Sequence, residues 1–201
     1  AAIIAVSDGM RKDVLRCYPQ LDPAKVRVIH NGIDVSTWPF TPRRAHDGPP
    51  RLLYAGRLEY EKGVHDVIAA LPRIRRTHPG TTLTIAGDGT QYDWLVEEAR
   101  KAKVTKAVNF VGRVDHSGLL ELLHRADAAV LPSHYEPFGI VALEAAAAGT
   151  PLVTSNVGGL GEAVINGKTG VSCPPRNVGA LASAVRKVLD DPAGADRKEH
   201  T

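Results

Sequence analysis

The sequence predicts an α/β fold, a Rossmann-like parallel sheet with helices on both faces. From residue 51 onward, short apolar runs alternate with longer amphipathic stretches, a pattern typical of parallel sheets with crossover helices. Glycines and polar residues follow these apolar runs directly, and the carboxyl ends of parallel strands share one edge of a sheet. With 201 residues, 43% hydrophobic and 23% charged, the chain is large enough for one well-buried domain and small for two.

The first 35 residues predict a small strand–helix–strand unit. Residues 3–6 are an apolar strand, and Ser7 is the expected cap of an amphipathic helix that ends before Pro19. Residues 26–29 are the second strand. The Asn31-Gly32 dipeptide that follows predicts a tight turn with positive φ.

Residues 36–50 predict an irregular connector, because prolines interrupt them repeatedly. After the connector, strands are predicted at residues 51–56, 81–86, 107–111, 128–132, 151–155 and 169–173. The helix after the first of these strands carries an apolar stripe at helical spacing, formed by Val64, Val67, Ile68, Leu71 and Ile74. The final helix carries a similar stripe, formed by Val178, Leu181, Ala182, Val185 and Leu189.

The most specific pattern is a pair of glutamates around a helix start. Glu136 lies in a loop after a buried strand, and Glu144 lies in the helix that is expected to begin after Gly139. The free N–H groups near Phe138, Gly139 and Ile140 suit a phosphate, which a glycine lets approach closely. Carboxylates accept hydrogen bonds from hydroxyls, so Glu136 is predicted to hold a sugar and Glu144 a ribose.

Two cationic residues follow the first strand of the main sheet. Arg57 and Lys62 lie in a loop that leads into a helix. If both face the cleft, they neutralise a diphosphate without a metal, Arg57 by a forked contact and Lys62 as a point charge. The alternative is that both are solvated charges paired with Glu59 or Glu61.

Glycines end the next two strands as well. Gly87 begins a Gly-Asp-Gly turn in which Tyr92 stands where a dinucleotide fingerprint needs its third glycine, which argues against NAD or FAD. Gly112 precedes Arg113, which is either a donor-site residue or a surface charge. His134 is predicted to be an ordinary loop residue.

A second glycine-rich loop ends in Glu162, after Gly158 and Gly159. This glutamate is predicted either to line the sugar or phosphate end of the site or to cap a short helix. The two cysteines, Cys17 and Cys173, lack metal-ligand spacing and are expected to be buried free thiols in a reducing cytoplasm.

The glutamate pair with Pro-Phe-Gly inside it resembles the donor-site motif of the retaining family 4 glycosyltransferases, which have the GT-B fold and include glycogen synthases, sucrose synthases and mannosyltransferases. Residues 28–34 resemble the family segment in which the chain passes from the N-terminal to the C-terminal domain. By this resemblance, residues 1–35 end an otherwise absent N-terminal domain, residues 36–50 connect, and residues 51–201 form the C-terminal nucleotide-sugar-binding domain.

The resemblance also implies roles for individual residues. Those implied to be catalytic are Arg57, Lys62 and Glu136. Those implied to bind the donor are Gly56, Gly87, Gly112, Arg113, Phe138, Gly139, Ile140 and Glu144. The cationic loop and the Pro-Phe-Gly segment look most like glycogen-synthase-like α-1,4-glucosyltransferases of mycobacterial glycogen and methylglucose lipopolysaccharide assembly.

That likeness implies metal-independent, retaining transfer of glucose from UDP-glucose or ADP-glucose to an α-1,4-glucan. In GT-B enzymes the N-terminal domain forms the acceptor wall, so this chain is expected to bind nucleotide sugar but to be inactive alone. Two alternatives stay open: a family 4 mannosyltransferase that uses GDP-mannose, and a non-catalytic nucleotide-sugar-binding module.

Charge and hydropathy exclude other classes of partner. A net charge of +3, spread along the chain, does not predict a nucleic-acid-binding surface. No apolar run approaches the roughly 18 residues of a transmembrane segment. We therefore expect a cytoplasmic protein with no membrane span.

Overall fold

The computed structural model describes residues 2–42, 46–167 and 169–191. Within these residues, six strands form one sheet in the order β5-β4-β3-β6-β7-β8, and every neighbouring pair is parallel. The strands are β3 (Arg51–Ala55), β4 (Thr82–Ala86), β5 (Val108–Gly112), β6 (Ala128–Leu131), β7 (Leu152–Ser155) and β8 (Val171–Cys173). The predicted parallel α/β sheet is confirmed.

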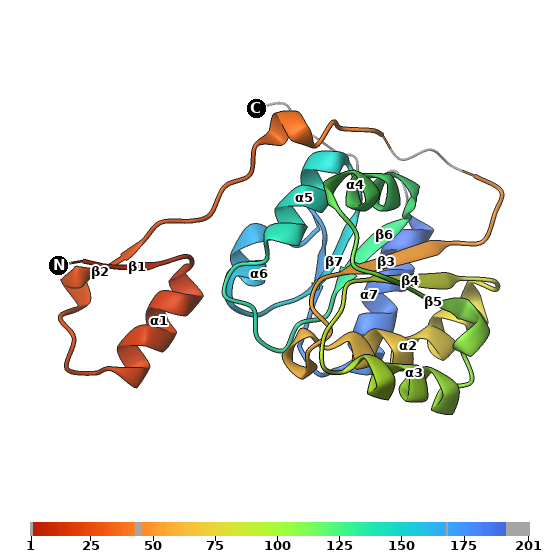
Figure 1. The fold of residues 1–201 in the computed structure, drawn as a ribbon, viewed down its shortest axis with the longest axis horizontal. Coiled ribbons are helices and arrows are strands. Elements are labelled where there is room, and N and C mark those ends of the chain that lie inside the picture. Colours follow the sequence, from red (N-terminus) through yellow and green to blue (C-terminus); the bar gives the residue numbers. More distant parts are fainter. Residues whose placement is uncertain (1, 43–45, 168, 192–201) are drawn as a thin grey trace.

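Helices cover both faces of this sheet (Figure 1). One face carries α2 (Val64–Thr77), α3 (Tyr92–Lys101) and α7 (Val178–Asp190), and the other carries α4 (His116–Arg125), α5 (Ile140–Ala148) and α6 (Gly158–Ala163). Successive strand side chains point to opposite faces, so Leu52 and Tyr54 join the core beneath α2 and α7, whereas Leu53 and Ala55 join the core beneath α4 and α5. The apolar stripes predicted in α2 and α7 are buried.

The strand order reverses between β3 and β6, which are neighbours at the centre of the sheet although β4 and β5 separate them in sequence. The chain winds outward from β3 to β5 and then returns to β6. In an open parallel sheet, ligands bind outside the carboxyl ends of the strands at such a switch point. The loops that leave β3 and β6 therefore flank the expected binding crevice.

The N-terminal residues form a separate small unit. β1 (Ile3–Ala5) pairs in parallel with β2 (Val26–Val28), and α1 (Asp8–Cys17) connects them. The Oγ of Ser7 accepts a hydrogen bond from the N–H of Met10 at 3.0 Å, which confirms the predicted cap. Figure 1 shows this unit beside α6, set apart from the main sheet.

The turn predicted at Asn31-Gly32 is wrong, because Gly32 is not among the glycines with positive φ and the chain continues without a turn from β2 to the short 3-10 segment η2 (Val35–Thr37). An Asn-Gly pair favours a turn where the strands on either side pair with each other. Here β2 pairs with β1 instead, and the following residues must span the distance to the main sheet (Figure 1).

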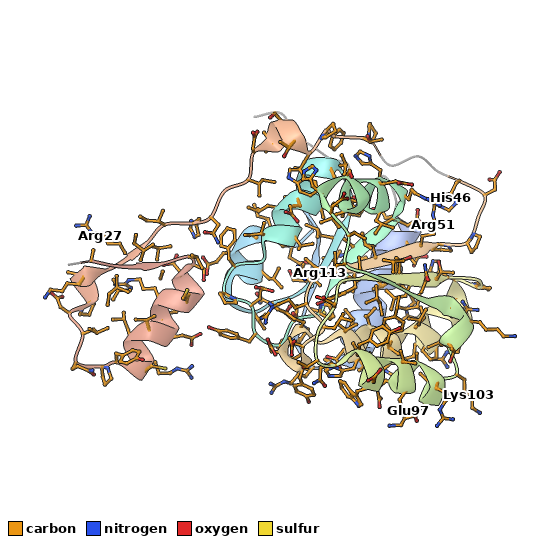
Figure 2. All side chains as sticks on the ribbon, in the orientation of Figure 1. Arg27, His46, Arg51, Glu97, Lys103 and Arg113 are labelled. Carbon is orange, nitrogen blue, oxygen red and sulfur yellow. The ribbon has the colours of Figure 1, made fainter. Side chains whose placement is uncertain are left out.

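The first part of the connector, residues 36–42, lies along α4 and α5. Trp38 is buried, with its ring centroid 4.2 Å from that of His116, and the N–H of Thr41 donates to the carbonyl of Ala148 at 3.1 Å. His46 and Arg51 lie at the amino end of β3 (Figure 2). Both contact the buried carboxylate of Asp127.

The predicted domain boundaries, residues 1–35, 36–50 and 51–201, stay predictions. Residue 1, part of the connector (residues 43–45) and the last part of the C-terminal domain (residues 192–201) lie outside the described residues.

The two cysteines differ in burial. Cys173, at the end of β8, is buried, and burial with the nearby charge of Asp66 raises the pKa of its thiol to about 11. Cys17 is exposed, so the prediction of a buried thiol is wrong there; it ends α1, a helix with no buried residue among those described. No helix in the described residues is long and apolar enough to cross a bilayer.

Candidate functional site

Two loops meet at the switch point. We call residues 56–63, which follow β3, the cationic loop, and residues 133–139, which follow β6, the acidic loop. The backbone N–H groups of His134 and Tyr135 both donate to the carbonyl of Glu61, at 2.7 and 3.3 Å. These contacts join the two loops through their backbones.

Lys62 and Glu136 form an ion pair across these loops. The Nζ of Lys62 lies 2.7 Å from Oε2 of Glu136, and the two side chains are only 14% and 17% exposed. Limited exposure lowers the effective dielectric around the pair and strengthens its interaction with any charged ligand. Two of the residues predicted to be catalytic are thus neighbours, although their catalytic roles stay predictions.

Arg57 lies beside this pair with its side chain in solvent. The side chain is 67% exposed, and its guanidinium contacts the carboxylate of Glu61 at 3.4 Å, which is the pairing that the alternative interpretation of the loop expected. The backbone below is fixed, since the buried hydroxyl of Tyr54 donates to the carbonyl of Arg57 at 2.7 Å. Burial and the nearby charge of Glu136 raise the pKa of Tyr54. The exposed side chain of Arg57 therefore extends from a backbone position that is fixed.

No side chain caps the N-terminus of α5, the end of a helix that favours anions. Gly139 is its N-cap, with φ of 91°, and no side chain caps the first turn. Leu160 packs where a Cβ on Gly139 would lie. The side chain of Phe138 is buried, so only its backbone can face a donor, whereas Ile140 is exposed.

Glu144 lies on α5, five residues into the helix, half-buried and separate from the Lys62–Glu136 pair. Burial raises the pKa of its carboxyl group, although the ring of His116 acts in the opposite direction. Counted from Gly139, Glu144 is about 7 Å further along the helix axis. The two glutamates therefore lie on either side of the uncapped helix start.

Gly56, Gly87 and Gly112 end three adjacent strands. The N–H of Gly56 donates to the carbonyl of Ala86 at 3.0 Å, and the N–H of Gly87 donates to that of Gly112 at 2.7 Å. A Cβ on Gly87 would collide with the backbone of Gly56, which explains the glycine there. Arg113, labelled in Figure 2, is 80% exposed and contacts Asp88 at 3.7 Å.

The prediction that His134 is an ordinary loop residue is wrong. Its ring is 3% exposed, and its Nε2 lies 2.8 Å from the Oδ2 of Asp66 in the first turn of α2. The two residues are 68 positions apart, so no local sequence pattern predicts the contact. Sequence reasoning had no signal for Asp66 at all.

His65, Asp66 and His134 place their donor atoms within 4.8 Å of one another, a grouping that could hold a metal ion. Histidines that ligate metals normally donate their second ring N–H to an acceptor. The Nδ1 atoms of His65 and His134 are buried without such a partner among the described residues. The grouping therefore fits a metal poorly.

Glu162 contacts the N-terminal unit, and its placement at the sugar or phosphate end of the site stays a prediction. Its carboxylate accepts from the N–H groups of Asp8 and Gly9 at 2.9 and 2.8 Å and lies 3.1 Å from the Nε2 of His30. It caps α1, not the short helix that the sequence suggested. The hydroxyl of Ser7 also donates to the carbonyl of Pro137 at 2.6 Å, so this unit contacts the acidic loop directly.

Glu162→Ala should loosen the N-terminal unit. Partial burial acts to raise the pKa of Glu162, but the amides of Gly9 and Asp8 with the ring of His30 outweigh it and lower that pKa. A lowered pKa contributes stability above the unfolded value that is lost as pH falls through the folded value. Amide hydrogen exchange in residues 7–10 should rise in the variant, and in the unmodified chain only below about pH 4.

Glu97→Ala is the matched control, because Glu97 is an exposed glutamate paired with Arg100 on α3. Exchange in residues 7–10 should stay unchanged in that variant. Equal exchange in the unmodified chain and in Glu162→Ala at neutral pH would contradict a capping role for Glu162.

Comparison with known proteins gives close relatives. The family described as glycosyl transferases group 1 matches residues 40–200. A glycogen synthase of Mycobacterium tuberculosis is 68% identical over 198 residues, which are 98% of this chain and 47% of that protein. An alpha-maltose-1-phosphate synthase of the same species is 37% identical over 99% of this chain and 56% of that protein. The chain thus spans about half the length of the curated relatives it matches.

Solved structures agree on the fold. Sucrose-phosphate synthase from Thermosynechococcus elongatus superposes with a TM-score of 0.82 at 31% identity, over 96% of this chain and 50% of that one. HepE from Anabaena, solved with UDP-glucose, gives a TM-score of 0.85 at 23% identity, over 96% of this chain and 55% of that one, a likeness that shows the fold alone. These neighbours are GT-B glycosyltransferases, as the sequence resemblance implied. Since the family match covers most of the sequence, the chain belongs to the glycosyl transferases of group 1.

Proposed function

We propose that this chain supplies the donor site of a retaining glucosyltransferase, which moves glucose from a nucleotide-diphosphate glucose to an α-1,4-glucan. The observation that carries this proposal is the Lys62–Glu136 pair beside the uncapped N-terminus of α5 at the switch point of the sheet. A nucleotide sugar presents hydroxyls, a diphosphate and a ribose in that order. The site offers a carboxylate, cationic groups with helix N–H donors, and a second carboxylate in a corresponding order.

The proposed chemistry is electrostatic. Departure of the nucleoside diphosphate gathers negative charge on the phosphates while an oxocarbenium-like sugar forms. Lys62, Arg57 and the N–H groups at the start of α5 would stabilise that charge where it develops, without a metal ion. Glu136 would orient the sugar through its hydroxyls and hold Lys62 in place, rather than act as a general base.

The relatives guide the choice of acceptor. The relative at 68% identity is named a glycogen synthase, which favours a glucan chain as acceptor. The relative at 37% identity is named an alpha-maltose-1-phosphate synthase, which makes glucose 1-phosphate the second acceptor to test. GDP-mannose is the donor that a mannosyltransferase would use instead.

Donor screening by calorimetry tests this proposal on the 201-residue chain itself. We expect UDP-glucose or ADP-glucose to bind and GDP-mannose to bind at least about tenfold more weakly, a difference of about 1.4 kcal/mol. Preferential binding of GDP-mannose would replace the proposal with a mannosyltransferase. Binding of none of the three would contradict a donor site.

Transfer should need more of the protein than this chain. We expect no glucan elongation by the 201-residue chain and measurable elongation when it is part of the full-length protein, with glucan or glucose 1-phosphate offered as acceptor. Elongation by the chain alone would overturn the expectation of an incomplete acceptor site. Donor binding without transfer in the full-length protein would favour a nucleotide-sugar-binding module.

A further inference from the structure

We propose that His134 and Asp66 are positioning residues, whose buried hydrogen bond holds Lys62 and Glu136 in the geometry that the donor needs. This inference rests on the proposed function. The bond joins the acidic loop to the first turn of α2, which directly follows the cationic loop. The acidic loop is thus tied both to Lys62 in the cationic loop and to Asp66 in the helix that follows that loop.

Packing fixes the ring of His134 on several sides. The ring lies next to Gly63, where a Cβ would come within 3.2 Å of its Cδ2. The rings of His65 and Tyr60 meet it edge-on, with centroids 5.1 and 5.7 Å away. Since the side chain is 3% exposed, it has little freedom to adopt another rotamer.

Asp66 defines the direction of the hydrogen bond. Its carboxylate can only accept, so the Nε2 of His134 carries the proton and donates. The N–H of Asp66 donates to the carbonyl of Gly63 at 2.8 Å, which fixes Asp66 in the first turn of α2. A carboxylate is favoured there by the positive end of the helix dipole. The backbone of His134 is fixed in the same way, because its N–H donates to the carbonyl of Glu61 at 2.7 Å. Both residues of the hydrogen bond are therefore held in place by their backbones.

Short chain distances connect this link to the ion pair. A single residue, the exposed Tyr135, separates His134 from Glu136. On the other side, Asp66 follows Lys62 by four residues, across the start of α2. A shift of the His134 side of this link therefore moves the carboxylate of Glu136, and a misplacement of about 1 Å can cost about a hundredfold in catalysis.

Three variants separate positioning from stability. His134→Gln keeps a donor at the place of Nε2, whereas His134→Leu removes it and leaves the carboxylate of Asp66 with only the longer contact to Nε2 of His65, at 3.6 Å. The double variant His134→Leu with Asp66→Leu replaces the buried polar pair with apolar side chains, a change that is often neutral or stabilising. It restores packing without the directional bond.

We expect His134→Gln to bind the preferred donor of the unmodified chain, UDP-glucose or ADP-glucose, within about threefold of its affinity. His134→Leu and the double variant should bind it about tenfold to a hundredfold more weakly, even where the double variant keeps its melting temperature. Donor affinity in the double variant equal to that of the unmodified chain would overturn the proposal, because the pair would then serve stability alone. Failure of His134→Gln to restore affinity over His134→Leu would overturn it too.

A measurement without ligand separates this proposal from the proposed function. Amide hydrogen exchange in residues 133–139 should be faster in His134→Leu and the double variant than in the unmodified chain and His134→Gln. If no nucleotide sugar binds the unmodified chain, the proposed function fails, and the positioning claim stands or falls on this exchange alone. His78→Leu, which removes a histidine paired with Asp190 at the far end of α2, should leave exchange and binding unchanged.

Discussion

Replacing Lys62 with methionine should lower the turnover number of the full-length protein by about 100- to 1,000-fold, the range found when one preorganised charge-stabilising group is removed from an active site. Methionine keeps most of the side-chain volume but removes the positive charge. The carboxylate of Glu136, 17% exposed, then loses its partner at 2.7 Å and repels the diphosphate. Steady-state transfer from UDP-glucose or ADP-glucose measures the effect.

The mechanism is tested by comparing how much the turnover number falls with how much donor affinity falls. Charge on the leaving phosphates grows toward the transition state, so the turnover number should fall more than donor affinity. Lys101→Met is the matched control, because Lys101 pairs with Glu98 on the exposed side of α3, and it should transfer normally. Turnover of Lys62→Met within about twofold of normal would contradict an electrostatic role.

Gly63→Ala should disrupt both loops at once and abolish detectable donor binding. Gly63 has φ of 65° and caps α2, and a Cβ there would collide with the carbonyl of Pro132 and crowd the ring of His134. The left-handed conformation alone costs a non-glycine residue about 1 to 2 kcal/mol. To relieve the collision, the acidic loop must move away from Lys62, and this movement adds to the cost. Calorimetry with the preferred nucleotide sugar, and thermal unfolding, measure the two effects.

Gly167→Ala controls for the backbone conformation. Gly167 has φ of 81°, and nothing lies within 4 Å of a Cβ built on it, so the variant carries the conformational cost without a collision. It should lose about 1 to 2 kcal/mol of stability and bind donor normally. Equal behaviour of the two alanine variants would show that the contact between the loops does not matter.

The strands were predictable because burial on both faces of a parallel sheet demands continuous apolar runs. Residues 128–131 show this directly, since every residue of β6 is buried. The edge at which the polar loops gather follows from the same topology, so Lys62 and Glu136 were predicted to share a cleft from their positions after β3 and β6. Sequence patterns were sufficient wherever the structure of a segment depends on its own residues.

Predictions failed where the conformation or role of a residue depends on a contact with a distant segment. The side chain of His134 is held in a buried position by its hydrogen bond to Asp66, 68 residues away. Glu162 caps α1 across 154 residues of sequence, and nothing near it marks that role. Gly32 does not adopt a positive φ, because β2 pairs with β1 and not with a following strand. In each case the partner, and not the local pattern, determines the outcome.

The structure of this chain with UDP-glucose or ADP-glucose bound tests the account most directly. We predict the diphosphate within hydrogen-bonding distance of Lys62 and of the N–H groups at the start of α5, with sugar hydroxyls at Glu136 and the ribose at Glu144. A diphosphate bound away from the loops that follow β3 and β6, with Lys62 and Glu136 still paired only to each other, would contradict it.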